Sequence, residues 1–254
     1  MYRMIIRKTP QQVDQMAAAG EILVRCLKML ERKTRAGITT LELDETAEKF
    51  IRSQGAEPAF KGYRGFPGSI CASPNSMVVH GIPDSNPLQR GDLLSIDVGV
   101  VKDGWVADAA ITVPVGAITP EAEKLLEVTK GALFSGIEQA RPENHLGDIG
   151  AAIQRHVEAE GLSIIRTLVG HGIGREMHEE PQVPNFGEPG RGPELEEGMV
   201  LAIEPMVNAG GPLVRMGDDG WAVYSEDDSL AAHFEFTVAI TPEGPRVLTP
   251  WHQG

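Results

Sequence analysis

Two carboxylates, Asp97 and Asp108, stand in positions where a charge is costly. Asp97 interrupts an apolar run over residues 93–101, and Asp108 lies in the next apolar run. A buried carboxylate without a partner loses the hydration that stabilises its charge. The Asp103-Gly104 pair between the runs is the strongest short signal for a two-residue hairpin turn. That turn pairs Gly99 with Asp108, so the two carboxylates are expected on one face of the hairpin, roughly 5 to 8 Å apart.

Two like charges at this separation allow only a few arrangements. Either the pKa of one carboxyl group rises strongly, or both carboxylates bind a shared cation. A third interpretation is that they form the polar outer face of a solvent-exposed hairpin. Residues of the same chemical types later in the chain bear on this choice.

The elements that would position these residues can be located from helix and strand signals. Capping boxes that begin at Thr9 and Thr39 each predict the start of a helix. Thr119-Pro120 predicts a third helix start, and apolar residues at helical spacing predict a fourth helix over 146–160. Strands are predicted over 76–80, 92–101, 105–114, 162–168, 199–207 and 232–240, an irregular segment over 56–75, and a rigid loop over 181–197.

The order of these elements indicates an internal duplication. The strand that contains Asp97 can be aligned with the strand that contains Glu204 at an offset of 107 residues. Two Thr-Pro helix starts lie 110 residues apart, and two glycines that end helices lie 106 residues apart. Three landmarks in nearly one register favour a single domain, residues 1–254, built from two related halves over about 9–115 and 116–248.

The duplication adds carboxylates of the same kind. Glu204 and Glu235 lie in apolar runs of the second half, so four carboxylates are expected to face one another. Two divalent cations would balance their four charges. His171 lies in Gly170-His-Gly-Ile-Gly174, where glycines let the backbone approach a site closely. One imidazole would complete the donor set of a dinuclear metal site.

These residues and the motifs around them resemble one known family. The motifs are Val79-His-Gly-Ile-Pro83, Gly170-His-Gly-Ile-Gly174, His178-Glu-Glu-Pro-Gln-Val183 and Ile203-Glu-Pro-Met-Val207. Together with the candidate ligands they are similar to the type I methionine aminopeptidases, over nearly the whole chain. The resemblance implies an α+β pita-bread fold, in which two pseudo-symmetric helix-helix-strand halves surround a central antiparallel sheet.

The resemblance also implies a role for each candidate ligand. Asp97 would chelate one metal ion, Asp108 and Glu235 would bridge both ions, and His171 and Glu204 would complete the coordination of the other. Oxygen donors with one imidazole suit Co, Mn, Fe(II) or Zn. Two such ions about 3.5–4 Å apart can hold a hydroxide that attacks the first peptide bond.

The same resemblance assigns the residues that handle the substrate. His80, His178 and Glu204 would be catalytic, with Glu204 as the proton shuttle and a histidine as the donor to the developing oxyanion or the leaving nitrogen. The implied activity is removal of the initiator methionine from nascent proteins and peptides when the second residue is small. The methionine pocket is matched by position or type to Tyr63, Phe66, Cys71 and Trp221, and His80 and His178 would also bind the substrate.

Two departures from the family pattern concern the surroundings of the site rather than its ligands. Ala109 follows Asp108 where a hydroxyl residue is common, and Met177 precedes His178 where an aromatic residue is common. Both changes affect the shape of the pocket and the groups that support the ligands.

Two rival functions remain open. An Xaa-Pro aminopeptidase or dipeptidase of the same fold would carry the same ligands, but such enzymes usually have a whole N-terminal domain. Here only 96 residues precede Asp97. A metal-free relative would act as a binding protein, but such relatives lose ligands, whereas all five are present in this chain.

Composition narrows the cellular context. The chain has 254 residues with 23 Lys+Arg against 36 Asp+Glu, and its formal charge of −13 argues against stable binding to nucleic acid. Two cysteines cannot form a disulfide framework and are compatible with a reducing compartment. No apolar run is long enough for a membrane span, and the first residues lack the pattern of a signal peptide. We therefore expect a cytoplasmic enzyme. We also expect a monomer that contacts the ribosome transiently.

Overall fold

The computed structural model describes residues 4–253, and four α-helices form within them. Both predicted capping boxes form, at Thr9 with Gln12 and at Thr39 with Glu42. The side chain of Thr119 caps the third helix. These side chains bind backbone N–H groups that have no partner inside the helix. The helices are α1 (Pro10–Lys33), α2 (Thr40–Ser53), α3 (Pro120–Glu138) and α4 (Leu146–Ala159).

The strands of the described residues form four sheets, with strand orders β1-β4-β2 (β5 also pairs with β4), β13-β10-β6, β11-β12-β3 and β15-β14-β9-β7-β8. A single 3-10 turn, Tyr63–Gly65, follows β1. The strands are β1 (Glu57–Pro58), β2 (Cys71–Pro74), β3 (Met77–Val79), β4 (Leu93–Lys102), β5 (Trp105–Pro114), β6 (Ser163–Ile164), β7 (Gly170–Gly172), β8 (Glu179–Val183), β9 (Val200–Ile203), β10 (Met206–Asn208), β11 (Val214–Met216), β12 (Val223–Ser225), β13 (Ala231–His233), β14 (Phe236–Thr241) and β15 (Gly244–Val247).

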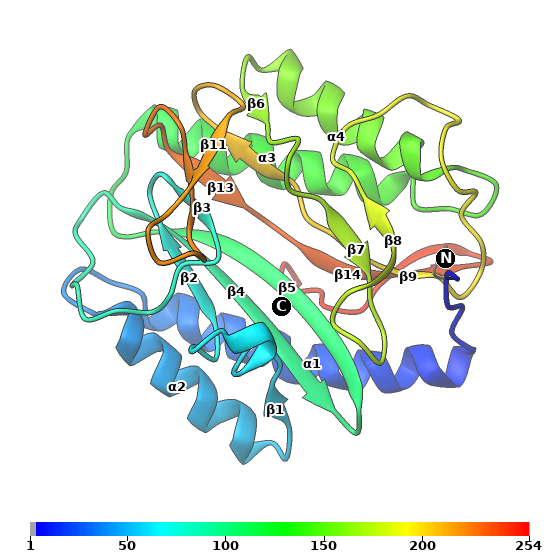
Figure 1. Ribbon diagram of the computed structural model, residues 1–254, viewed down its shortest axis with the longest axis horizontal. Helices are drawn as coiled ribbons and strands as arrows, with labels where there is room; N and C mark the ends of the chain where they lie inside the picture. Colours follow the sequence, from blue (N-terminus) through cyan, green and yellow to red (C-terminus); the bar gives the residue numbers. More distant parts are fainter. Residues whose placement is uncertain (1–3, 254) are drawn as a thin grey trace.

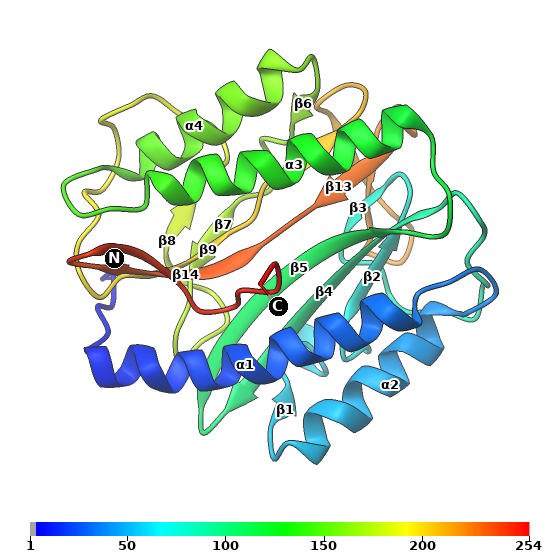
Figure 2. The same cartoon turned by 180° about the vertical axis from the view of Figure 1, so that it is seen from behind.

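The helices lie behind the strands. Figure 1 views the strands from the front, and Figure 2 shows α1 and α3 crossing their back, with α2 beside α1 and α4 beside α3. Leu23, Leu27 and Leu30 of α1 are fully buried, and α1 packs against β4 and β5. The α3–α4 pair covers the later strands β6, β9, β10 and β13. No helix within residues 4–253 has the length and apolar character needed to cross a membrane.

The β4–β5 hairpin has the predicted register. Gly99 pairs with Asp108 across a turn at Asp103-Gly104. Both turn residues have positive φ, 51° and 74°, as this type of two-residue turn requires. The prediction that Asp97 and Asp108 lie diagonally on one face of the hairpin is therefore confirmed.

The strands predicted over 199–207 and 232–240 are each interrupted beside a carboxylate. Glu204-Pro205 separates β9 from β10, and Phe234-Glu235 separates β13 from β14. Pro205 has no N–H to donate to a ladder, and Glu235 donates its N–H to the carbonyl of Ala110 in β5 instead. The prediction of continuous strands is wrong at these two points, because both carboxylate residues leave the regular pairing.

Hydrogen bonds outside any regular ladder join β5 to β14 and to Glu235 just before it. The Thr237 hydroxyl donates to the carbonyl of Asp108 at 2.8 Å and accepts from its N–H at 3.0 Å. The N–H of Glu235 lies 3.0 Å from the carbonyl of Ala110. These bonds replace a backbone ladder, and they fix Asp108 and Glu235 relative to each other.

Three shorter predictions also differ from the structure. Residues 56–75 are not wholly irregular, because they include β1, β2 and the 3-10 turn. The strand predicted over 162–168 is reduced to β6, and the loop predicted over 181–197 begins inside β8. Such short strands show little periodicity in sequence, since their pairing depends on partners far along the chain.

Candidate active site

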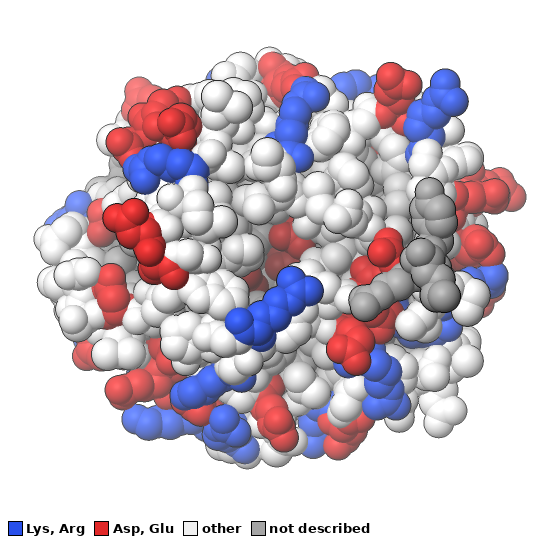
Figure 3. All heavy atoms as spheres, in the orientation of Figure 1, with Lys and Arg blue, Asp and Glu red and all other residues white. Residues whose placement is uncertain are grey.

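The front face of the molecule is hollowed near its centre, and acidic side chains lie at the bottom of the hollow (Figure 3). The hollow is a cavity of about 190 Å³. All eleven site residues proposed from the sequence line it. They are Tyr63, Phe66, Cys71, His80, Asp97, Asp108, His171, His178, Glu204, Trp221 and Glu235.

Four carboxylates reach the cavity from four different strands or strand ends. Asp97 lies in β4 and Asp108 in β5, whereas Glu204 follows β9 and Glu235 precedes β14. Burial raises the pKa of Asp97 and of Glu204 to about 7. Burial, and then repulsion from neighbouring carboxylates, raises the pKa of Asp108 and of Glu235 well above its ordinary value. The cluster is therefore fully charged at neutral pH only if cations compensate it.

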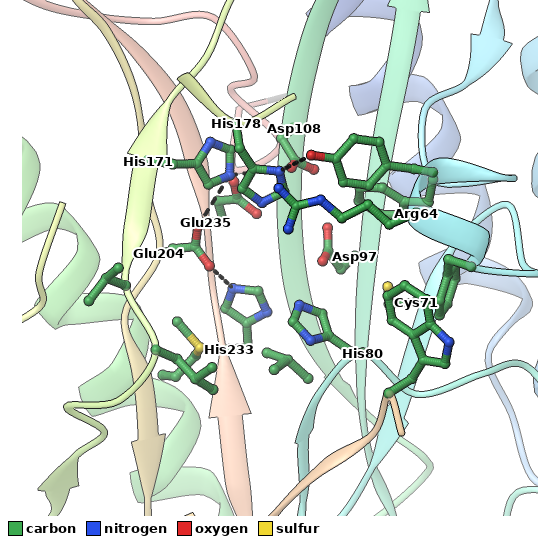
Figure 4. Close-up of a pocket in the computed structure, with 18 residues that line it drawn as sticks. Arg64, Cys71, His80, Asp97, Asp108, His171, His178, Glu204, His233 and Glu235 are labelled. Atoms are coloured by element: carbon green, nitrogen blue, oxygen red, sulfur yellow. Dashed lines mark hydrogen bonds and ion pairs between the residues drawn. The ribbon is translucent and has the colours of Figure 1, made fainter. Parts of the chain in front are cut away.

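The His171 imidazole directs one nitrogen toward these carboxylates (Figure 4). Its Nδ1 lies 2.9 Å from the carbonyl of Gly172, and a carbonyl only accepts, so Nδ1 carries the proton. Nε2 then offers a lone pair, 3.6 Å from Glu204 Oε1 and 4.0 Å from Asp108 Oδ2. This tautomer is the one that a metal-binding histidine needs.

The cluster fits a divalent cation. One donor atom from each of Asp108, His171 and Glu235 lies within 4.8 Å of the others. Buried oxygens of Asp97, Asp108 and Glu235 have no hydrogen-bond partner among the described residues, although buried polar atoms normally have one. Glu204 and Asp97 lie on opposite sides of this triplet (Figure 4). Several carboxylate oxygens with one imidazole suit Mn, Fe(II), Co or Zn.

His178 lies over the carboxylates and against an aromatic ring. Its Nδ1 is 2.8 Å from the Tyr63 hydroxyl, and the two rings stack with centroids 5.5 Å apart. The His171 ring lies 4.2 Å away. Burial, and then the neighbouring His171 and Arg64, lower the pKa of His178 to about 3. The ring is therefore neutral at neutral pH.

His80 is held in a strained backbone conformation. Its φ is 61°, in the left-handed region that residues other than glycine seldom adopt. The chain then presses against β2, because a Cβ added to Gly81 would lie 2.2 Å from the Ala72 carbonyl. Burial lowers the pKa of His80 to about 4. The fold thus fixes a neutral imidazole on the cavity wall.

Another part of the wall is apolar. Phe66 and Trp221 meet edge to face with centroids 5.2 Å apart. Burial, and then the nearby Asp97 carboxylate, raises the pKa of Cys71 well above its ordinary value. Cys71 is therefore a neutral wall residue and not a nucleophile. Met177 is buried behind the wall, where its methyl group would lie 2.9 Å from a Cβ added to Gly99.

Sequence reasoning missed two lining residues that can do chemistry. His233 is buried, its Nε2 lies 3.6 Å from Glu204 Oε2, and neither ring nitrogen makes a hydrogen bond to a described residue. His233 precedes Glu235 by two positions, so the alternation of a strand would have placed both on one face. Arg64 has a φ of 49° within the 3-10 turn, and no signal in the sequence indicates that conformation.

Comparison with known proteins places these residues in a family context. The model of a family described as metallopeptidase family M24 matches residues 14–242. The chain is 55% identical to a methionine aminopeptidase of Clostridium perfringens and 50% identical to methionine aminopeptidase 1 of Bacillus subtilis. Each alignment covers 97% of this chain and 99% of the relative.

Solved structures share the architecture. A methionine aminopeptidase from Rickettsia prowazekii superposes with a TM-score of 0.96 at 41% identity, over 97% of this chain and 100% of its own. A prolidase from Pyrococcus furiosus gives a TM-score of 0.78 at 24% identity, over 96% of this chain but 65% of its own. The prolidase therefore shares the fold alone. The predicted combination of helices and antiparallel sheets is confirmed by these matches.

Proposed function

The chain belongs to metallopeptidase family M24, and from this premise we propose that it is a methionine aminopeptidase that acts when the second residue is small. One observation carries the proposal. A single small cavity holds four carboxylates and an imidazole on its floor and an apolar wall of Phe66, Cys71 and Trp221 beside them. The carboxylate and imidazole groups of the floor can bind metal ions that promote hydrolysis, and the apolar wall can pack against a flexible thioether side chain.

We assign the five candidate ligands to two divalent cations. Asp97 would hold one cation, Asp108 and Glu235 would bridge both, and His171 and Glu204 would hold the other. Such cations polarise a carbonyl group and lower the pKa of water. The partnerless carboxylate oxygens and the tautomer of His171 support this assignment.

The protein groups would move the protons. Glu204, with one oxygen 3.6 Å from His171 and the other 3.6 Å from His233, would accept a proton from the attacking water and pass it to the leaving amine. When the Tyr63 hydroxyl donates to Nδ1 of His178, the proton of the neutral ring lies on Nε2. That Nε2–H would donate to the scissile carbonyl oxygen as its negative charge develops. His80 would bind the substrate peptide group from the opposite wall.

The shape of the cavity supports an exopeptidase. A free α-amino group, in its neutral form, would bind a cation at the carboxylate floor, whereas a peptide extended at its N-terminus would need space beyond about 190 Å³. The Phe66–Trp221 pair and Cys71 would surround the methionine side chain. Sulfur contacts with aromatic rings favour methionine over aliphatic side chains.

The remaining expectations follow from this activity. We propose that residues 1–254 form one domain of two related halves, about 9–115 and 116–248, each of which supplies two helices and two of the four carboxylates. We also propose a cytoplasmic monomer that contacts the ribosome only transiently, and its formal charge of −13 argues against a stable complex with nucleic acid.

A panel of tripeptides tests the substrate. The protein, supplied with Mn²⁺ or Co²⁺, would be assayed on Met-Ala-Ser, Met-Leu-Ser, Leu-Ala-Ser and Ala-Pro-Ser at equal concentration. We expect kcat/KM to be highest for Met-Ala-Ser. Faster cleavage of Leu-Ala-Ser or Ala-Pro-Ser would overturn the assignment.

A further inference from the structure

A buried ion pair lies just outside the catalytic cavity. Lys8 Nζ is 2.6 Å from Glu179 Oε2, and the two side chains are only 2% and 5% exposed. Lysine and glutamate are almost never this buried unless they are paired. Lys8 belongs to the segment before α1, and Glu179 begins β8.

The second oxygen of Glu179 closes the turn that carries His178. Glu179 Oε1 accepts hydrogen bonds from the backbone N–H of Arg175 at 2.9 Å and of Glu176 at 3.3 Å. The turn ends at His178, the residue directly before Glu179 in the chain. The carboxylate therefore bonds the start of this turn with one oxygen and Lys8 with the other.

Both ends of this arrangement are anchored in the fold. Lys8 donates its backbone N–H to Gly198 at 2.6 Å and its Nζ to the Ile6 carbonyl at 3.1 Å. A Cβ added to Gly174 would lie 2.5 Å from Glu179 Oε1 and 2.6 Å from Lys8 Cε, so the pair packs directly against the backbone. The Gly174 carbonyl accepts from Val106 of β5 at 2.9 Å.

The His178 side chain itself has little support. Among the described residues its ring makes one hydrogen bond, to the Tyr63 hydroxyl, and its other ring contacts are with Tyr63 and His171. Tyr63 lies in the 3-10 turn, which is not part of any sheet. The position of the imidazole therefore depends on its backbone, and a misplacement of about 1 Å can cost about a hundredfold in rate.

We propose that Lys8 and Glu179 are positioning residues for His178, which hold the turn 175–178 so that the imidazole stays over the carboxylate floor. This inference rests on the proposed function, in which His178 donates to the scissile carbonyl oxygen. It gives the segment before α1 a part in catalysis although that segment does not line the cavity.

The test compares variants at two neighbouring positions, Lys8 and Arg7. Lys8→Met removes the buried pair, whereas Arg7→Met removes the exposed pair of Arg7 with Glu196, whose side chains are 53% and 51% exposed. With Met-Ala-Ser and saturating Mn²⁺, we expect Lys8→Met to lower kcat at least tenfold and to change KM less than threefold. Arg7→Met should stay within twofold of the unmodified protein in both parameters.

A second pair of variants separates positioning from loss of folding. The double variant Lys8→Met/Glu179→Gln leaves no unpaired buried charge. The amide oxygen introduced at position 179 can still accept from the two backbone N–H groups, but the bond to Lys8 is lost. We expect native circular dichroism and metal content with kcat lowered at least tenfold. When Lys8→Met is added to His178→Ala, we expect kcat to fall by less than a further factor of two. Both changes remove the same contribution, that of the positioned His178 imidazole.

Three results are decisive. If the unmodified protein releases no methionine with metal present, the proposed function fails. If it is active and the Lys8 variants keep kcat within twofold of Arg7→Met, the inference fails while the function stands. If Lys8→Met lowers kcat by the same factor with and without His178, the pair acts through another residue, and the inference is again overturned.

Discussion

His171 and His178 lie together yet have opposite hydrogen-bonding states at Nδ1. Their ring centroids are 4.2 Å apart. The Nδ1 of His171 faces a backbone carbonyl and must donate, whereas the Nδ1 of His178 faces the Tyr63 hydroxyl, which can itself donate. One ring therefore presents a lone pair to the cavity, and the other can present a proton there.

This contrast predicts different defects for two alanine variants. His171→Ala should lose bound metal, and excess metal should partly restore its activity. His178→Ala should retain its metal and lose about 2.7–4 kcal/mol of transition-state stabilisation, roughly 10²–10³ in kcat. Metal analysis of each purified variant, with kcat measured at saturating metal, checks both. A His178→Ala protein that loses its metal, or that keeps both metal and kcat, contradicts this assignment.

The candidate metal ligands were found from local motifs and the candidate pocket residues from the family resemblance, but neither route found His233 or Arg64. The glycines around His171 and the apolar run around Asp97 are visible in sequence. The position of His233 depends on β13 ending before Phe234, and the position of Arg64 depends on a left-handed φ. The spacing of His233 from Glu235 is a local signal of a shared face, whereas the conformation of Arg64 leaves no local pattern.

At the scale of elements, the β4–β5 hairpin is more predictable than the contact between β5 and the chain around β14. The β4–β5 register follows from Asp103-Gly104, which lies between the two strands. The break before Glu235 instead reflects its bond to Ala110 in β5, more than a hundred residues earlier in the chain. Pro205 gives a local sign of a break, but no such sign precedes Glu235.

The C-terminal segment supports Glu235 from behind the sheet. Trp251 Nε1 donates to the Glu235 carbonyl at 2.9 Å, and its ring stacks on Phe236 with centroids 4.6 Å apart. Trp251→Phe should keep the stacking and lose the hydrogen bond, which costs about 1 kcal/mol of unfolding free energy. Urea unfolding of the metal-loaded protein measures this loss.

The control for this prediction is Gln253→Ala. Gln253 is exposed, and Lys28 bonds its backbone carbonyl rather than its side chain, so this variant should stay within about 0.5 kcal/mol. Equal stability of Trp251→Phe and the unmodified protein would show that the indole N–H contributes nothing.

For the whole molecule, the buried carboxylates connect metal content to stability. Burial raises the pKa of Asp97 and of Glu204 to about 7 in the folded chain without cations, against about 4 when unfolded. Between those values the folded state binds more protons than the unfolded state, so its stability falls as pH rises. The stability that these two protonated carboxyl groups contribute should therefore be fully present below about pH 4 and lost as the pH rises through 7.

This argument predicts a pH effect that depends on metal removal. Chelator-treated protein should lose a few kcal/mol of unfolding free energy between pH 5 and pH 8. Each unit by which the pKa of a carboxyl group differs between the folded and unfolded states is worth about 1.4 kcal/mol. Metal-loaded protein should not, because cations compensate the ionised carboxylates. Urea midpoints at a series of pH values measure both. A midpoint that stays constant or rises with pH in the chelated protein contradicts the buried cluster.

The central claim is that metal ions held by the carboxylate cluster are required to release an N-terminal methionine. The most direct measurement is methionine release from Met-Ala-Ser while Mn²⁺ is titrated into chelated protein, in parallel with Asp108→Asn/Glu235→Gln. We predict no turnover without metal, a rate that rises with bound metal in the unmodified protein, and at most residual turnover in the variant. Undiminished cleavage by the chelated protein, or by the variant, would contradict the account.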